Sequence, residues 1–553
     1  MKILKKYWAE LLVFGAIFAV LMIDLAPDIT WMNTDSDGAH YVLAAKYMLP
    51  AHNTSAPLFL LLGRLFLFIP YGTDAWRMGL ISVLSTTASS ILIYLIVKRH
   101  LLGNNRARLY AIISALVFGG SALVISQSTI VESYALCTFF MLLAYYFSLK
   151  RKWVKVALAI GLLWATHTLF AWILWAVLLI KYRELRDVTL IIIPLAFLSF
   201  YAYIPICTAV NGDLGMWHNT NFNDFVTGNL GVLTMLGGAL SVWDAPKRIL
   251  DTLAMLGVSL GLGFVVIVVH LIKTNKRLKY VLLWLFLLPI IWFATNLSAE
   301  TYVYMLPSIA FGAILTGIGL SKLHLSWSWA TCAVAVALMI FNANYFDIGR
   351  TLDPEMSATK FYNEELAKIP DGDIFLGGGW NWTMVFLYNK EENRNIIPVS
   401  TDTLPSEEYL NMLENQGIKL ERSDSQSHVT KQGEVALSIA ELNEGVWIAI
   451  ETKPEVYQYV IEPAQGNEDY IGRWIGEEVE PEWRWKPSNP YKFISGQLEV
   501  AEWHHILRSN HNALFVISLA IYGYAMVWYV FKVIGKKKKA VSNADSVGTQ
   551  TTE

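Results

Sequence analysis

The chain has 553 residues, of which 55% are hydrophobic and only 16% are charged, and its formal net charge is −2. Soluble domains usually contain about 25% charged residues, so this composition excludes an ordinary soluble domain and predicts a polytopic α-helical membrane protein. The small net charge says little about partners, and we expect a lipid bilayer and no nucleic acid among them. The three cysteines, Cys137, Cys207 and Cys332, form neither a disulfide framework nor a metal-ligand spacing.

Basic residues set the predicted orientation of the chain. Lys2, Lys5 and Lys6 precede the first apolar run, residues 8–26, which we interpret as a retained anchor rather than a cleaved signal peptide. Because Lys and Arg mark the cytoplasmic side, the N-terminus is expected inside and the first outer loop, residues 27–74, outside. Later apolar runs keep every basic cluster inside: 75–97, 109–124, 134–149, 154–180, 188–207, 249–272, 280–295, 303–320, 327–345 and 512–531. We therefore expect roughly twelve crossings of the cytoplasmic membrane, with both termini cytoplasmic.

The run 154–180 has basic residues at both of its ends. If both ends lie inside, the run must be a hairpin of two short helices with its tip near His167. Each arm would be shorter than the span of about 20 residues that a transmembrane helix needs. Broken backbone at membrane depth is tolerated only where protein or a wet cavity receives it, so His167 is expected near an outer cavity.

Residues 1–346 form the predicted transmembrane domain, and residues 347–510 are polar and contain no predicted span. We interpret this second region as an extracytoplasmic α/β domain, followed by a final span at 511–533 and a basic, disordered cytoplasmic tail at 534–553. A strand at 373–376, a glycine turn, a helix at 382–388 and a strand at 396–399 predict a small parallel unit. The glycine turn matches no dinucleotide or phosphate-loop spacing and is interpreted as a tight turn.

Ionisable side chains gather in the first outer loop, and such groups at a membrane edge are functional candidates by default. Asp35 and Asp37 either cap the helix expected to begin near residue 39 or perform chemistry, because Asp is a favoured N-cap residue. With His40 they are also candidate ligands of a divalent metal, although their spacing fits no strong metal motif. Arg64 follows an apolar stretch and is either a snorkelling interfacial arginine or a ligand for phosphate.

Further candidates lie in later outer segments. Glu132 stands at the outer mouth of a span, where it orients an acceptor, pairs with Arg64 or caps a helix. His52 and His167 either bind phosphate or sugar or are structural. Trp217, in the long outer loop 209–247, either stacks on a sugar or anchors the chain at the membrane interface.

Several motifs resemble, in order, those of a family of bacterial membrane proteins related to a eukaryotic protein O-mannosyltransferase. Residues 37–40, 44–45, His52, Pro57 and 61–66 resemble the family's first outer loop. Glu132-Ser133-Tyr134-Ala135-Leu136 resembles its short Glu-x-Tyr-Ala-Leu motif. Later segments also match its pattern: 161–167, 203–205, 211–217 and 362–388. The resemblance covers most of residues 29–410.

The family belongs with the GT-C glycosyltransferases, so the resemblance implies a multi-span fold, an acidic residue in the first outer loop and a polyprenyl-phosphate sugar donor. By its spacing to His52, Asp37 rather than Asp35 falls on the family's loop aspartate. The resemblance thus implies that Asp37 is the base that takes a proton from the acceptor hydroxyl of a protein, lipid or glycan. The other candidates then bind donor or acceptor: Asp35, His40, His52, Arg64, Glu132, His167 and Trp217.

Two departures from the family pattern stand out. The family has Glu where this chain has His40, and a His-Pro-Pro-Gly-x-Pro run where this chain has residues 52–57. These changes indicate either a different substrate or lost activity. The alternative function is a non-catalytic transporter, flippase or assembly factor for surface polysaccharide. Transporters tend to carry inverted repeats and charges at mid-membrane, whereas the ionisable residues here gather in outer loops, which favours the enzyme.

Overall fold

The computed structural model describes residues 2–29, 37–51, 56–211, 245–273, 279–295, 303–345, 363–364, 366–404, 406–425, 428–449, 462–463 and 471–473. Asp35, His52 and Trp217 lie outside the described residues. So do the predicted final span 511–533 and the predicted tail 534–553.

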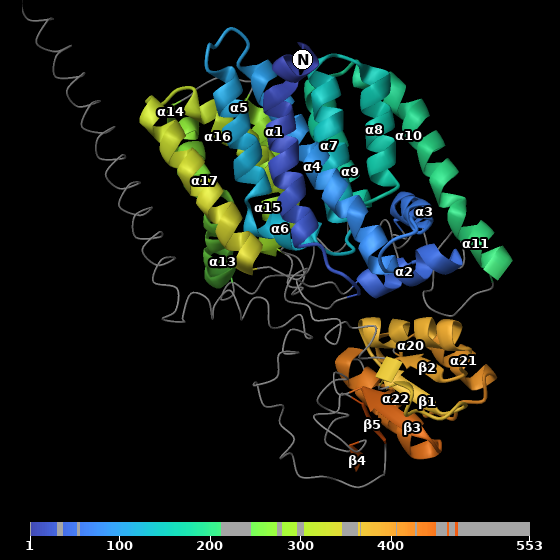
Figure 1. Cartoon of the computed structure of the whole chain (residues 1–553). Coiled ribbons are helices and arrows are strands. Elements are labelled where there is room, and N and C mark those ends of the chain that lie inside the picture. The colour runs from blue at the N-terminus through green and yellow to red at the C-terminus, as the bar shows by residue number, and fades with distance from the viewer. Residues whose placement is uncertain are drawn as a thin grey trace, which may run out of the picture.

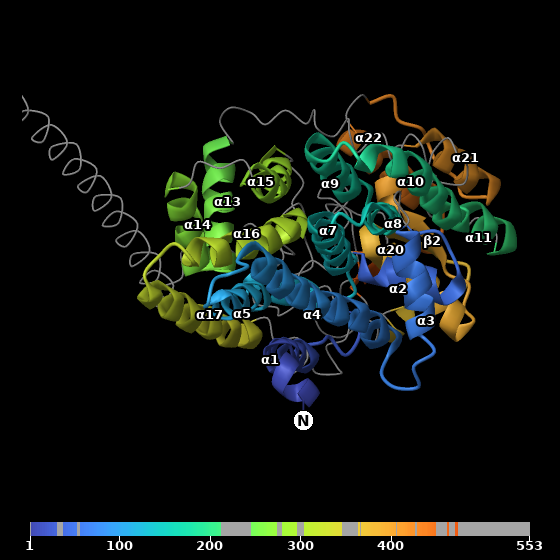
Figure 2. The ribbon, with the colours of Figure 1, turned by 90° about the horizontal axis from the view of Figure 1, so that it is seen from above.

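Most of the described chain is helical, and the helices pack side by side in one bundle (Figures 1 and 2). The short helices α2 (Gly38–Tyr47) and α3 (Pro57–Phe66) lie at one end of this bundle, between the long helices α1 (Lys2–Ile23) and α4 (Asp74–His100) in sequence. The bundle continues with α5 (Ala107–Gly119), α6 (Ala122–Ser128), α7 (Tyr134–Leu149), α8 (Trp153–Trp164), α9 (Thr168–Lys181), α10 (Leu185–Tyr201), α11 (Tyr203–Asn211), α13 (Ala245–Leu260), α14 (Leu262–Lys273), α15 (Lys279–Thr295), α16 (Leu306–Leu320) and α17 (Leu325–Tyr345).

Four helical segments of the described chain are long and apolar enough to cross a membrane: Lys6–Ile23, Asp74–His100, Val303–Leu320 and Leu325–Ala343. A fifth arises if α5 and α6 count as one bent span, and several shorter apolar helices accompany them. Of the third segment 89% is buried against protein, but only 22% of the first, so α16 is central and α1 presents apolar side chains outward. The number of membrane crossings, roughly twelve, stays a prediction.

The predicted hairpin is confirmed. Helices α8 and α9 are joined by Ala165-Thr166-His167, which places His167 at the tip, directly before the first residue of α9. The Leu58 N–H at the start of α3 donates to the Ala165 carbonyl over 3.0 Å. The tip of the hairpin therefore packs against the segment between α1 and α4.

The apolar run predicted at 109–124 is not one straight helix. Helices α5 and α6 are bent by 61° at a break that contains Gly120. The Asn342 side-chain amide of α17 donates to the Gly120 carbonyl over 2.8 Å and so satisfies a backbone group that the bend removes from the helical ladder. A Cβ atom at Gly120 would lie 2.8 Å from the Ala335 carbonyl oxygen, so the close approach of α17 requires glycine here.

The α/β part contains a mixed sheet in the order β2-β1-β3-β5-β4. Strand β1 (Ile374–Gly377) pairs in parallel with β2 (Ile397–Ser400) and β3 (Val446–Ala449), and α20 (Gly379–Glu392) connects β1 to β2. The predicted parallel unit of strand, helix and strand is thus confirmed. The remaining elements are η5 (Thr401–Thr403), α21 (Glu407–Asn415), α22 (His428–Leu442), β4 (Glu462–Pro463) and β5 (Ile471–Arg473). The domain bounds 347–510 and its extracytoplasmic location stay predictions.

The sheet and its helices lie beyond the end of the bundle at which α2 lies (Figure 1). If that end is extracytoplasmic, a cysteine at exposed Asp424 should react with a membrane-impermeant maleimide in intact cells, whereas one at exposed Asn105 should react only after lysis. Cys332, which is only partly buried, is replaced by alanine in both variants to remove background labelling. The reverse pattern would contradict the predicted orientation.

Candidate active site

Asp37 occupies the N-cap position of α2. Its side chain accepts no capping hydrogen bond from the described residues of that helix, so the carboxylate is not used as a helix cap. The start of a helix carries partial positive charge, which favours a carboxylate at this position. The imidazole Nδ1 of His40, one turn along α2, lies 4.0 Å from Asp37 Oδ1, and the His40 side chain is 5% exposed compared with 28% for Asp37. The pair thus has a buried imidazole behind a partly accessible carboxylate.

Glu132 reaches the same region from the segment between α6 and α7. It is 2% exposed, its Oε2 accepts the Ser133 N–H over 3.0 Å, and its carbonyl accepts the Ser82 hydroxyl of α4 over 2.8 Å. These contacts fix both the carboxylate and its backbone. A buried carboxylate held in this way is costly to keep inside a protein, and such a group is a functional candidate.

Tyr41 links the two acidic residues. Its hydroxyl lies 3.4 Å from the Ser133 hydroxyl, to which it donates. Burial raises the pKa of the Tyr41 hydroxyl well above its ordinary value, and the charges on Asp37 and Glu132 raise it further. Both carboxylates therefore act on the same phenol, which stays a neutral hydrogen-bond donor at physiological pH. Sequence reasoning missed Tyr41, although it directly follows the motif at residues 37–40.

His167 belongs to a cluster of four rings beside Glu132, which we call the aromatic cluster: Tyr134, His167, Phe170 and Tyr304. The His167 ring centroid lies 5.6 Å from that of Tyr134, 4.6 Å from that of Phe170 and 5.6 Å from that of Tyr304. Tyr134 follows Glu132 by two positions, so the hairpin tip meets the acidic segment here. The structure therefore brings Asp37, His40, Glu132 and His167 into one region.

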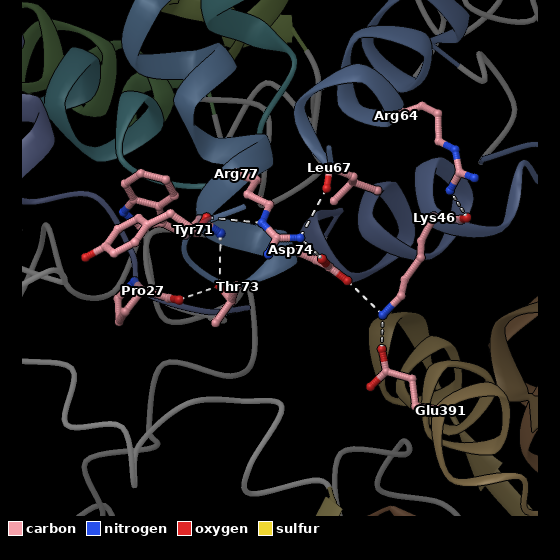
Figure 3. Close-up of polar contacts among 10 residues, drawn as sticks. Pro27, Lys46, Arg64, Leu67, Tyr71, Thr73, Asp74, Arg77 and Glu391 are labelled. Carbon is pink, nitrogen blue, oxygen red and sulfur yellow. Dashed lines mark hydrogen bonds and ion pairs between the residues drawn. The ribbon is translucent and has the colours of Figure 1, made fainter. Parts of the chain in front are cut away.

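Arg64 is not part of this region. Its Nη1 donates to the Lys46 carbonyl over 2.5 Å (Figure 3). Its guanidinium lies over the Phe68 ring, 5.9 Å from the centroid. Lys46 is in the last turn of α2 and Asp37 precedes the first, and a helical rise of 1.5 Å per residue separates them by about 14 Å. The role of Arg64 as a phosphate ligand stays a prediction.

Lys46 is the centre of a second polar group, the Lys46 network (Figure 3). Its Nζ lies 2.7 Å from Asp74 Oδ2 at the start of α4 and 2.5 Å from Glu391 Oε1 in the last turn of α20. Asp74 Oδ1 also accepts from Arg77 over 3.1 Å. Burial alone would lower the pKa of Lys46, but the hydrogen bonds to Asp74 and Glu391 raise it well above its ordinary value. The network ties α2, α4 and α20 together.

Within the described part of the chain, no group of three or more His, Cys, Asp or Glu side chains is arranged to hold a metal ion. Asp35, the third of the candidate ligands beside Asp37 and His40, is outside that part. A divalent metal at these three residues stays a prediction.

Residues 37–191 match the family model for the N-terminal domain of the protein O-mannosyl-transferase TMEM260. The match begins at Asp37 and includes Glu132 and His167. A comparison with curated protein sequences finds no match.

Several solved structures match the chain, and the first of those described below has a similar fold. ArnT from Cupriavidus metallidurans bound to undecaprenyl phosphate is 11% identical, with a TM-score of 0.55 over 81% of this chain and 93% of that chain. The same protein in the apo state gives a TM-score of 0.43 at 12% identity, over 72% and 90% of the two chains. The Archaeoglobus fulgidus oligosaccharyltransferase tethered with an acceptor peptide gives 0.44 at 12% identity, over 75% and 69%.

The similarity to ArnT concerns the fold. The family match concerns the segment 37–191, which contains Asp37, Glu132 and His167. The resemblance predicted from the sequence is confirmed: the chain is similar, over residues 37–191, to the N-terminal domain of the protein O-mannosyl-transferase TMEM260, and its fold is similar to that of ArnT.

Proposed function

We propose that this protein is a membrane glycosyltransferase that moves a sugar from a polyprenyl-phosphate-linked donor to a hydroxyl of a protein, lipid or glycan on the extracytoplasmic side. One observation carries the proposal. Asp37, Glu132 and His167 lie on three segments of the matched stretch that contact one another. The Tyr41 hydroxyl of α2 donates to Ser133, which follows Glu132, and the Tyr134 ring lies 5.6 Å from the His167 ring. The undecaprenyl phosphate bound to ArnT, a protein of similar fold, supports the class of donor.

Asp37 is the proposed general base. As the acceptor oxygen forms its bond to the sugar's anomeric carbon, the bond from that carbon to the phosphate oxygen breaks and the acceptor proton passes to the carboxylate. The leaving group is the polyprenyl phosphate. A base needs to be accessible to the substrate, and the partly exposed Asp37 meets this requirement better than Glu132, which is 2% exposed.

Glu132 is the proposed acceptor-orienting group. Its carboxylate is anchored by the Ser133 N–H, and Ser133 in turn accepts from the neutral Tyr41 hydroxyl. Donors and acceptors held in fixed positions hold an incoming hydroxyl in the geometry of attack. The aromatic cluster around His167 borders the same space and is the proposed contact for sugar or phosphate.

The proposal is tested by transfer in lipid nanodiscs. Purified protein is incubated with synthetic polyprenyl-phosphate sugars and candidate acceptors, and both the glycosylated acceptor and the released polyprenyl phosphate are measured. A glycosyltransferase yields both products in equal amounts. A flippase or assembly factor would leave the donor intact. Loss of transfer with a chelator would favour the divalent metal predicted at Asp35, Asp37 and His40.

Glu132→Gln should lower kcat/KM by about tenfold, equivalent to about 1.4 kcal/mol, mainly through a higher KM for the acceptor. The amide keeps the size of the side chain and can accept the Ser133 N–H, but it loses the negative charge that orients the acceptor hydroxyl through Ser133 and Tyr41. The measurement is an acceptor titration at saturating donor, with exposed Glu184→Gln as the matched control. Equal kcat/KM values for both variants would remove Glu132 from the acceptor site.

A further inference from the structure

Helix α20 of the α/β part is buried on two sides. It packs on β1 and β2 of its own sheet and on α2 of the bundle. Its apolar side chains join the hydrophobic core of the bundle rather than a core confined to the sheet: Trp382, Met384, Val385, Leu387 and Tyr388. A helix that is apolar on all sides is typical of burial between two bodies, and α20 fits this description over its central turns.

The first turns of α20 and α2 meet at the proposed base. The Trp382 ring stands edge-on to the His40 ring, with centroids 6.3 Å apart and planes at 89°. Both residues are buried, with 2% of Trp382 and 4% of His40 exposed. His40 in turn lies 4.0 Å from the Asp37 carboxylate. A chain of contacts therefore runs from the α/β part through an imidazole to Asp37.

The last turns of the same two helices are joined by the Lys46–Glu391 ion pair. Contacts at both ends mean that α2 and α20 run side by side in the same direction. Figure 1 shows α20 next to α2, where the α/β part meets the bundle. Two points of attachment fix the rotation of α2 as well as its position. The α/β part is thus placed to control where Asp37 points.

We propose that α20 completes the active site, with Trp382 as a positioning residue that holds His40 against Asp37 and the Lys46–Glu391 pair as the clamp that keeps α2 in register. This inference rests on the proposed function and assigns the α/β part a role in it. Trp382 acts through His40 and touches neither donor nor acceptor. Displacing the reacting group by about 1 Å can cost 10²-fold in rate. The contact between Trp382 and His40 can therefore affect the rate although Trp382 does not touch Asp37.

The kinetic test compares Trp382→Ala with Trp382→Phe in the full chain. The alanine variant should lower kcat by about 10- to 100-fold with little change in acceptor KM, while phenylalanine, which retains an aromatic ring, restores most of the rate. Leu387→Ala is the matched control, because Leu387 is equally buried on α20 and joins the same core. It should lose stability but keep kcat per folded molecule. Equal kcat losses for Trp382→Ala and Leu387→Ala would overturn the proposal.

A double-mutant cycle separates positioning from general packing. If Trp382 acts only through His40, then adding Trp382→Ala to His40→Gln should lower kcat no further. Additive losses would overturn the proposal.

If Trp382→Ala fails to fold, Glu391→Gln replaces it as the test variant. A several-fold loss of kcat is expected in Glu391→Gln. No loss is expected in Glu392→Gln, whose exposed carboxylate is the adjacent control.

Hydrogen exchange separates failure of this inference from failure of the proposed function. Amides of α2 should exchange faster in Glu391→Gln than in wild type or Glu392→Gln, whatever reaction the protein performs. If Glu391→Gln exchanges faster but the wild-type protein transfers no sugar, the clamp is retained and the transferase is rejected. If the wild-type protein is active and Glu391→Gln changes neither the exchange of α2 nor kcat, the clamp alone is rejected.

Discussion

Asp37→Asn is expected to lower kcat for sugar transfer by about 10²–10⁴-fold, the usual contribution of a general base. The amide has the size of the carboxylate but cannot take the acceptor proton. Helix α2 should still form, because Asn is as good an N-cap residue as Asp and the Asp37 side chain makes no capping bond within the described part of α2. Single-turnover transfer is measured in nanodiscs at equal protein concentrations, and the thermal midpoint of each variant is measured beside it.

Asp424→Asn is the control for this variant, because Asp424 is exposed on the α/β part, away from the site. It should keep full activity. Wild-type turnover by Asp37→Asn would reject Asp37 as the base, and the segment around Glu132 would then be the next place to look. Lost activity with an unchanged thermal midpoint would locate the defect in chemistry rather than in folding.

Gly120→Ala is expected to lower the free energy of unfolding by about 1–3 kcal/mol, although it adds only a single methyl group. The new Cβ would lie 2.8 Å from the Ala335 carbonyl oxygen and 2.9 Å from Met339 Cβ. Both neighbours are on α17 and one is backbone, so neither can move aside without shifting the helix. The same shift would weaken the bond from Asn342 to the Gly120 carbonyl. Thermal unfolding in detergent measures the effect.

Gly257→Ala is the control, because Gly257 lies within helix α13 and nothing lies within 4 Å of its Cβ position. Alanine there should leave stability unchanged or raise it by about 0.5–1 kcal/mol through its better helix propensity. A Gly120→Ala variant as stable as wild type would show that the bend between α5 and α6 tolerates a side chain.

Local signals in the sequence were sufficient for part of the fold. The hairpin of α8 and α9 could be predicted because basic flanks at both ends force an even number of passages. The unit of β1, α20 and β2 could be predicted from short apolar runs separated by glycine. The bend at Gly120 could not, because the carbonyl it frees is satisfied by Asn342 from a helix far along the chain.

The candidate site, like the fold, could be predicted only in part from the sequence. Asp37, His40, Glu132 and His167 were predicted from their place in outer segments and from family motifs, and the structure gathers them. The position of Arg64 depends on how α3 packs on α2, which no local pattern reveals, and it lies at the far end of α2. The contact of Trp382 with His40 could not be predicted either, since it joins the α/β part to the helical bundle over a long stretch of sequence.

The most direct test of the central claim is a structure of the protein with a non-hydrolysable polyprenyl-phosphate sugar bound. Our account predicts that the anomeric carbon lies between Asp37, Glu132 and the aromatic cluster, with space for an acceptor hydroxyl within about 2.6–3.2 Å of the Asp37 carboxylate. A headgroup bound beside Arg64 at the other end of α2, or on another face of the bundle, would contradict it.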